Sequence, residues 1–258
     1  MKNFIAFDTE TTGIEPGSRM LELAAIRFNE DGEKLGEFCA MVNPHMPLPP
    51  DAAAVNGITP EMMIDAFSAP SALESFLEWL PPDPTFIAHN ASFDCGIIAW
   101  EAQYARIKWN YEAPVIDTLR MARAMAETPD NKLQTLVAHC KFSVIGDAHR
   151  AMADADCAMR YFLYARKKAE PSREAWELTG YTHVYVPPPD PIANLPVFIA
   201  GGLPFTFTYR DAKEAVTTRT LIPYGYAMVK DAFMFHGLDS LRGERRTFRA
   251  DRIISVLE

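Results

Sequence analysis

The stretch "FDTETTG", residues 7–13, follows the apolar opening "MKNFIA" and decides how the fold begins. The apolar run predicts a first β-strand, with Asp8 and Glu10 at its end. Alternate residues of a strand face the same side, so these two carboxylates project together. Like charges about one pleat apart repel each other unless a partner compensates them. Mg²⁺ or Mn²⁺, which prefer oxygen ligands, would compensate the two acids, but taken alone the stretch is weak evidence for a metal site, because most exposed acids simply end a strand in water.

The composition limits the kind of protein. The chain has 258 residues, 48% of them hydrophobic, which is enough for one sizeable core and a second small one. A net charge of -9 argues against broad electrostatic coating of polyanions. Residues 1–168 hold 15 basic and 23 acidic side chains, whereas residues 204–258 hold 9 and 7. Contact with a phosphate backbone would therefore need metal ions or the more basic C-terminal segment.

Cysteine usage and hydropathy bear on the location of the protein. The four cysteines form no CxxC pair, so neither a zinc site nor a disulfide framework is indicated, and a reducing compartment fits. No apolar run approaches the roughly 18 residues of a membrane span, and the start lacks the pattern of a secretory signal. We expect a cytoplasmic protein that does not associate with membranes.

The N-terminal part begins with three predicted strands, at residues 4–8, 20–28 and 34–42. Asp31-Gly32, between the last two, is a strong hairpin signal. A loop is expected over residues 43–63. The spacing of apolar residues then predicts a helix over residues 71–80, with Ser71 as its cap.

Strands and helices alternate after this point. "TFIAHN" predicts a strand, "SFDCGIIAWEAQYA" a helix, "PVIDTLRMARAM" a strand that runs into a helix, "KLQTLVAHC" a short helix and "HRAMADADCAMRYFLYARKK" a long one. Strands that come first, with helices alternating later, indicate an α/β fold with a mixed sheet covered by helices.

A domain boundary is expected after residue 168. Residues 169–194 contain "VPPPDPIANLP", and this density of prolines predicts a semi-rigid linker. Residues 195–258 show runs of period 2 and predict a small β-rich domain. The predicted organisation is thus a domain of residues 1–168, a linker of residues 169–194 and a domain of residues 195–258.

Two further stretches carry side chains suited to a metal site. "HNASFD" places Asp94 just inside a helix that follows a strand, and "HRAMAD" places His149 and Asp154 at the start of the last helix. A histidine whose pKa lies near neutrality can take a proton from water, although a lone histidine is more often structural. Asp156 competes with Asp154, but two residues turn a helix by about 200°, so the two cannot face the same way.

Together, "FIAFDTETTG", "IAHNASFDCGII" and "GDAHRAMADADCAMRYF" resemble, in order and spacing, the three motifs of the DEDD exonuclease superfamily, in its histidine-bearing, DnaQ-like branch. The similarity covers about residues 1–168. It implies a ribonuclease H-like fold and a 3'-to-5' exonuclease that uses two Mg²⁺ or Mn²⁺ ions. Its implied substrates are the 3' ends of single-stranded DNA or RNA, from which nucleoside monophosphates are released.

The same resemblance implies the roles of individual residues. The metal-binding carboxylates would be Asp8, Glu10, Asp94 and Asp154, and the general base that activates the attacking water would be His149. Two metals held by carboxylates orient a nucleophile and compensate the charge that builds on the phosphate, so the chemistry agrees with the residue types.

Six further residues are candidates for substrate contacts: Thr11, Thr12, Gly13, Asn56, His89 and Asn90. The first three follow the acids in a tight turn whose backbone N–H groups can approach a terminal nucleotide, with ordinary turn chemistry as the alternative. Asn56 stands where related exonucleases often have histidine, which leaves the base or sugar preference open. His89 and Asn90 are expected to support Asp94.

The C-terminal segment resembles a WYL domain, a small Sm-like or SH3-like β-barrel, although residues 233–235 replace its Trp-Tyr-Leu signature. Alternation in "RRTFRADR" puts Arg245 and Arg249 on one face and Phe248 on the other. Such a basic face is suited to holding a single strand, with a solvated outer face as the alternative.

Two other functional classes remain open from the sequence. One is a non-catalytic nucleic-acid-binding or regulatory protein, against which the retention of all five catalytic positions speaks. The other is a metal-dependent hydrolase of free nucleotides or a phosphatase. The sequence does not distinguish DNA proofreading from RNA processing, does not support association with a polymerase, and says nothing of the oligomeric state.

Overall fold

The computed structural model describes residues 3–14, 18–46, 48–109, 113–143, 149–168, 177–178, 188–229 and 232–257. The chain forms two compact units. One comprises Met1–Thr12, Met20–Pro44 and Leu48–His183, and the other Gly13–Arg19, His45–Pro47 and Val184–Glu258. The expected domain limits stay a prediction, and most of the expected linker lies outside the described residues. Within the described ranges, no helix has the length and apolar character needed to cross a membrane.

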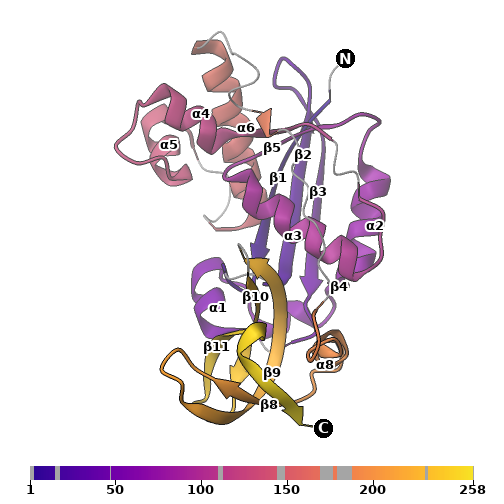
Figure 1. Ribbon diagram of the computed structural model, residues 1–258. Helices are drawn as coiled ribbons and strands as arrows, with labels where there is room; N and C mark the ends of the chain where they lie inside the picture. The colour runs from indigo at the N-terminus through magenta and orange to yellow at the C-terminus, as the bar shows by residue number, and fades with distance from the viewer. Residues whose placement is uncertain are drawn as a thin grey trace. The chain divides into compact units, whose positions relative to one another are not determined.

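The first unit is built on a seven-stranded sheet with the order β4-β3-β2-β1-β5-β6-β7 (Figure 1). Its strands are β1 (Phe4–Thr11), β2 (Met20–Phe28), β3 (Lys34–Asn43), β4 (Phe67–Ser68), β5 (Thr85–Ala88), β6 (Val115–Asp117) and β7 (Glu177–Leu178). Strands β1 to β3 form the expected antiparallel meander, and β5 and β6 run parallel to β1. The predicted mixed sheet is therefore confirmed. Strand β7 falls in the expected linker and pairs antiparallel with β6.

Helices cover both faces of this sheet (Figure 1). On one face lie α2 (Ala69–Trp79) and α3 (Ala91–Tyr104), and on the other α4 (Thr118–Met125), α5 (Leu133–Cys140) and α6 (Ala151–Lys168). Ile5 and Phe7 of β1 belong to the first core, and Phe4 and Ala6 to the second. The strand alternates between two apolar cores, so the even-numbered residues that follow Ala6 project towards α6.

The segment expected as a loop over residues 43–63 contains α1 (Pro50–Asn56) and the 3-10 helix η1 (Pro60–Met63), so this prediction was wrong in part. Both helices carry a proline in the first turn, where the missing N–H has no helical partner to lose. Gly57, with φ of 67°, ends α1 in the left-handed conformation that glycine adopts without strain. The prolines and the glycine begin and end a short helix here.

The cap of α2 also differs from the prediction. The helix begins at Ala69, and the hydroxyl of Ser68 accepts a hydrogen bond from the backbone N–H of Ser71 at 3.3 Å. Ser68 is the residue with extended backbone angles, so it is the N-cap, and Ser71 lies inside the first turn.

The second unit contains a five-stranded antiparallel sheet with the order β11-β10-β9-β8-β12. Its elements are α8 (Leu195–Gly201), β8 (Phe205–Arg210), β9 (Val216–Val229), β10 (Ala232–Asp239), β11 (Glu244–Arg249), η2 (Ala250–Arg252) and β12 (Ile253–Leu257). The β-rich character of the segment is confirmed. Pairing of β11 with β12, which would close a barrel, is not among the strand pairings of the described residues, and the barrel stays a prediction.

Aromatic side chains form the core of the second unit. The ring of Phe248 lies 5.2 Å from that of Phe207 and 5.7 Å from that of Phe235, centroid to centroid. Arg249, on the other face of β11, forms an ion pair with Asp251 at 2.6 Å. The alternation predicted for β11 is therefore confirmed, with the aromatic residue inside.

The two serines of α2 provide a matched pair for a stability measurement. We expect Ser68→Ala to lower the free energy of unfolding by about 1 kcal/mol, because an N–H of the first turn loses its acceptor. Ser71→Ala should change it by less than about 0.5 kcal/mol, as is usual for a position without such a role. Denaturant titration of both variants checks this, and equal effects would contradict the assignment of the cap.

Candidate active site

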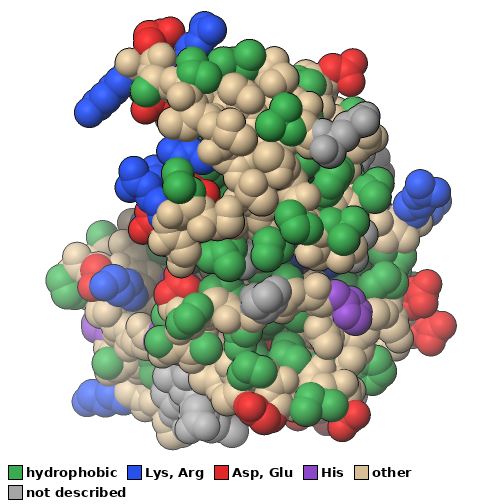
Figure 2. Space-filling view, turned by 90° about the horizontal axis from the view of Figure 1, so that it is seen from below, with side chains coloured by type: hydrophobic (Ala, Val, Ile, Leu, Met, Phe, Trp, Pro, Cys, Tyr) green, Lys and Arg blue, Asp and Glu red, His purple; other side chains and the backbone are tan. Residues whose placement is uncertain are grey.

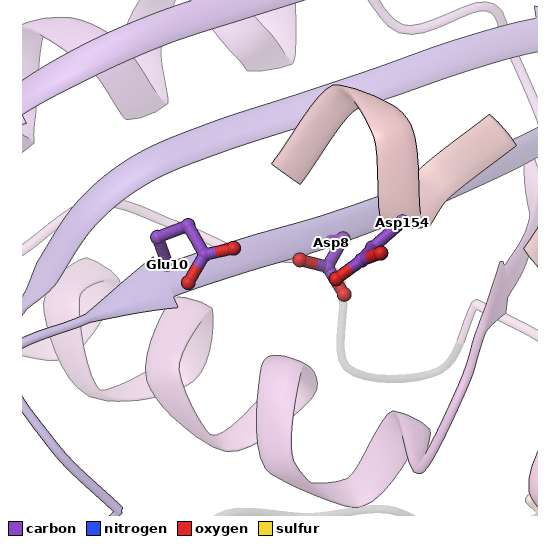
Figure 3. A group of neighbouring side chains, drawn as sticks. All are labelled: Asp8, Glu10 and Asp154. Carbon is purple, nitrogen blue, oxygen red and sulfur yellow. The ribbon is translucent and has the colours of Figure 1, made fainter. Parts of the chain in front are cut away.

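Three carboxylates meet at the end of β1. Asp8 and Glu10 come from the strand, and Asp154 comes from the first turn of α6 (Figure 3). Oxygen atoms of these three side chains all lie within 4.8 Å of one another. The arrangement follows from the alternation of β1, which turns its even-numbered residues towards α6. It brings together three of the four carboxylates that the motifs predict.

The fourth carboxylate, Asp94, lies beside this group but is not part of it. It is in the first turn of α3 and is 3% exposed. Its Oδ1 accepts hydrogen bonds from the backbone N–H of Thr9 at 2.9 Å and from the Thr9 hydroxyl at 2.7 Å. The negative charge of Asp94 raises the pKa of Asp8 more than that of any other neighbouring carboxylate. Thr9, which the sequence analysis did not single out, therefore fixes Asp94 against β1.

Burial and mutual repulsion raise the proton affinity of these groups. Burial, followed by the charges of Asp94 and Asp154, raises the pKa of Asp8 well above its usual value. Burial, followed by the charge of Asp154, raises the pKa of Glu10 to about 8. Burial raises the pKa of Asp94 to about 7 even though the hydrogen bonds from Thr9 act in the opposite direction. Without a cation the site therefore holds protons near neutral pH.

His149 lies two residues before Ala151, the first residue of α6, and has a left-handed φ of 62°. The prediction that it belongs to the helix was therefore wrong, and helical spacing does not govern its place relative to Asp154. Its Nε2 lies 3.0 Å from Nε2 of Gln134 on α5. Because an amide nitrogen only donates, this contact needs an imidazole nitrogen that accepts, as in the neutral ring. The positive form of His149 would lower the pKa of Asp154, which burial raises.

Asp156 is turned away from the three carboxylates, as the sequence predicts. Its Oδ2 lies 2.7 Å from Nε of Arg160, and its Oδ1 lies 3.0 Å from Nζ of Lys34. Two cations thus compensate this carboxylate, which is 2% exposed, and Asp154 is the member of the pair that faces the site.

The candidates for substrate contact lie in two places. Asn56, at the end of α1, donates from Nδ2 to the carbonyl oxygen of Thr11 at 3.4 Å, so α1 meets the end of β1. Thr11 is 9% exposed and Thr12 is fully buried, whereas Gly13 is partly exposed. Gly13 follows them in the chain. The structure thus brings Asn56 to the predicted turn.

His89 and Asn90 line a hollow of about 580 Å³, together with Arg123 of α4 and Lys132 before α5. The backbone N–H of Asn90 donates to Oδ1 of Asp117 at 3.0 Å, and its carbonyl accepts from the N–H of Phe93 at 2.9 Å. Asn90 therefore fixes the first turn of α3, which carries Asp94. Nδ1 of His89 lies 3.0 Å from the hydroxyl of Thr118, and burial lowers the pKa of its imidazole.

Comparison with known proteins agrees with this geometry. The profile of a family described as "Exonuclease" matches residues 5–162, more than half of the chain. The chain belongs to this exonuclease family. The predicted DEDD resemblance is confirmed, and the WYL domain profile matches residues 198–257 of this exonuclease-family protein.

The curated relatives are much longer than this chain. The "DNA polymerase III PolC-type" of Bacillus cereus is 35% identical over 164 residues, which are 63% of this chain and 11% of the relative. The corresponding protein of Bacillus subtilis is 34% identical over 173 residues, or 65% and 12% of the two chains. The exonuclease-family protein thus spans about a tenth of these relatives.

Solved structures share the fold. Exonuclease X, in complex with 5' overhanging duplex DNA, has a TM-score of 0.53 and 23% identity, covering 68% of this chain and 97% of that one. The nuclease domain of 3'hExo, a DEDDh family member bound to rAMP, has a TM-score of 0.57 and 16% identity, covering 65% and 93%. An E. coli ExoI-ssDNA complex has a TM-score of 0.59 and 16% identity, covering 92% and 55%.

The residues fit the divalent metal ions that DEDD exonucleases use. Asp8, Glu10 and Asp154 offer oxygen ligands close enough for one ion, and their shared negative charge has no other compensation within the group.

The raised pKa values predict how pH acts on the metal-free protein. Between about pH 4.5 and 8 the folded state holds a proton on Glu10 that the unfolded chain has released. Since the folded state binds more protons, its stability falls as pH rises. We expect the free energy of unfolding in EDTA to be lower at pH 9 than at pH 6, by about 1 kcal/mol or more.

Two controls accompany this measurement. Glu10→Gln removes a titrating group and should flatten the pH dependence. Mn²⁺ at pH 9 should restore stability, because a cation binds the ionised carboxylates. Equal stability of the metal-free protein at the two pH values would contradict the raised pKa values.

Proposed function

We propose that this exonuclease-family protein removes nucleotides from the 3' end of single-stranded DNA or RNA and releases nucleoside monophosphates. The observation that supports this most is the meeting of Asp8, Glu10 and Asp154, with Asp94 beside them. His149, which lies near Asp154, completes the residue set of a phosphodiester hydrolase.

We propose two divalent cations, Mg²⁺ or Mn²⁺, for this site. Asp8, Glu10 and Asp154 would hold the first. Asp8 and Asp94 would hold the second, because the charges of these two carboxylates interact although Asp94 lies outside the group of three. When bound, the ions lower the pKa of a water molecule and neutralise the charge that develops on the phosphate.

The residues of the chain supply the remaining steps. His149 accepts a proton from the attacking water, for which a neutral imidazole is the competent form. The bond from the water oxygen to phosphorus forms as the bond from phosphorus to the 3' oxygen breaks. The released mononucleotide keeps the phosphate, and the 3' oxygen of the shortened strand takes up a proton. Thr9 holds Asp94 in place during this step through its two hydrogen bonds.

The terminal nucleotide would contact the end of β1. The proposed contacts there are Thr11, Thr12 and Gly13, of which Gly13 is partly exposed, and Asn56 contacts the carbonyl of Thr11. The strand on its 5' side would use the hollow beside His89 and Asn90, where Arg123 and Lys132 bring positive charge. Cations are needed there because the body of the chain is acidic.

The nature of the strand is a separate question. Among proteins of the same fold, ExoI has been solved in complex with single-stranded DNA and the nuclease domain of 3'hExo bound to rAMP. We propose an unpaired 3' end as the common substrate. The match to polymerases covers 63% of this chain and 11% of the relative, so association with a polymerase is not part of the proposal.

The WYL segment is not proposed as the main binding surface. On the face of the molecule in Figure 2, the described Lys and Arg side chains lie at separate places among acidic and hydrophobic ones. Arg249 is paired with Asp251 within β11 and η2. The pairing of Arg246 with Glu244 and of Arg249 with Asp251 favours the solvated outer face over a continuous basic one.

A labelled single strand tests the reaction. We expect stepwise release of mononucleotides that depends on Mg²⁺ or Mn²⁺. Asp8→Ala and Asp154→Asn should abolish release, because the cation loses a ligand. Asp156→Asn, two residues further along the same helix, should retain it, since Asp156 pairs with Lys34 and Arg160. Circular dichroism checks that each variant is folded. Activity of Asp8→Ala near that of wild type would contradict the proposal, and hydrolysis of free nucleotides alone would identify the other class of hydrolase.

A second test addresses the general base. We expect His149→Ala to lower turnover by about 10²-fold or more, because the attacking water loses its proton acceptor. His139→Ala is the matched control, since His139 lies on α5 beside Glu127 and not at the site. Initial rates on matched DNA and RNA strands check this, and similar rates for the two variants would exclude the role of His149.

A further inference from the structure

Glu22 is a buried carboxylate beside the site for which no role has been assigned. It lies directly opposite Glu10 in the register of β1 and β2, so the two side chains leave the same face of the sheet. It is 1% exposed and stands in the otherwise largely apolar strand "MLELAAIRF". A charge in such a place is costly unless it is paired and hydrogen-bonded.

Both oxygens of Glu22 have partners from the start of α6. Oε1 accepts from Nη2 of Arg150 at 2.7 Å, and Oε2 accepts from Nε of the same guanidinium at 3.0 Å. Oε2 also accepts from the backbone N–H of Ala151 at 3.1 Å. The two-pronged contact fixes the orientation of the guanidinium as well as its distance. With its oxygens occupied in this way, Glu22 is unsuited to be a further metal ligand.

Arg150 and Ala151, which Glu22 anchors, lie between His149 and Asp154 in the sequence. Arg150 follows His149 directly, and its carbonyl oxygen accepts from the N–H of Asp154 at 3.1 Å. Ala151 is the first residue of α6. Glu22 therefore holds, from the sheet, the short piece of chain from which His149 and Asp154 project.

The pair also affects the charges of the site. Glu22 stands opposite Glu10 across β1 and β2, so the guanidinium that Glu22 holds lies on the same face of the sheet as Glu10. A guanidinium released from Glu22 would be close enough to interact with Glu10, and it would then compete with a cation for that carboxylate. Pairing keeps the arginine occupied and leaves Glu10 available.

We propose that Glu22 and Arg150 are positioning residues of the hydrolytic site, which fix His149 and Asp154 relative to Asp8 and Glu10. The inference rests on the proposed exonuclease function. The alternative is a purely structural role, in which the pair only stabilises the packing of α6 against the sheet. The two roles predict different results for a folded variant without the pair. A positioning role predicts lower activity, and a purely structural role predicts unchanged activity.

The decisive variant of the full chain is Glu22→Met/Arg150→Met. Apolar side chains of similar volume often replace a buried ion pair without loss of stability, so this variant is expected to fold. Its net charge equals that of wild type, which means that a changed affinity for Mn²⁺ reports geometry and not overall charge. We expect kcat to fall about 10- to 100-fold with KM little changed, because small displacements of catalytic groups are costly.

Two further variants separate charge from geometry. Arg150→Lys keeps the positive charge but loses the fork, and we expect it to lose most of the turnover. Arg160→Met removes another arginine of α6 that pairs with an aspartate at 2.7 Å, and it should keep the kcat of wild type. Should the double variant fail to fold, Glu22→Gln keeps an acceptor for Ala151, removes the ion pair and should show the same fall in kcat.

Three measurements decide the outcome: kcat and KM on a 3'-labelled strand, Mn²⁺ affinity by calorimetry, and hydrogen exchange of the Ala151 and Asp154 amides. A folded double variant with the kcat and Mn²⁺ affinity of wild type would overturn the positioning role. If wild type releases no nucleotide, the proposed function fails by itself. Weaker Mn²⁺ binding and faster exchange in the double variant would then still support the positioning role, and unchanged values would overturn it.

Discussion

Repulsion between partly buried carboxylates is the constraint around which the first unit is arranged. Asp8, Glu10 and Asp154 converge within 4.8 Å, and the charge of Asp94 adds to theirs. Such a group does not form by its own preference, because each carboxylate raises the proton affinity of the others. Two apolar cores, one on each face of β1, hold the strand in place and so impose the convergence. A bound cation relieves the repulsion between these carboxylates, and this relief gives the site its affinity for a cation.

The acids around this site divide into those left uncompensated and those given a cation of the protein. Asp156 pairs with Lys34 and Arg160, and Glu22 pairs with Arg150. Asp8, Glu10 and Asp154 have no comparable partner within their group. The protein therefore neutralises some carboxylates and not their neighbours. The paired carboxylates, Asp156 and Glu22, stabilise the packing of α6, and the unpaired ones are left to bind a metal ion.

Much of this could be predicted from the sequence, for reasons specific to each element. The alternation of β1 placed Asp8 and Glu10 on one side, and the helical period separated Asp154 from Asp156. Other features were missed because they depend on contacts remote in sequence. Thr9 contacts Asp94 over 85 positions, and Arg150 contacts Glu22 over 128. A lone acid in an apolar strand was the available signal for Glu22. A local signal was also misread: Ser71 was predicted as the N-cap of α2, and the N-cap is Ser68.

The sequence by itself determined most of the strands and helices, the common side of Asp8 and Glu10 and the family, since periodicity and motifs are local properties. Only the tertiary structure decided which acids meet. It directed Asp94 to Thr9, left His149 outside α6 and gave Glu22 a partner. These outcomes depend on how the sheet and its helices pack, and packing brings together residues whose separation along the chain carries no information about distance in space.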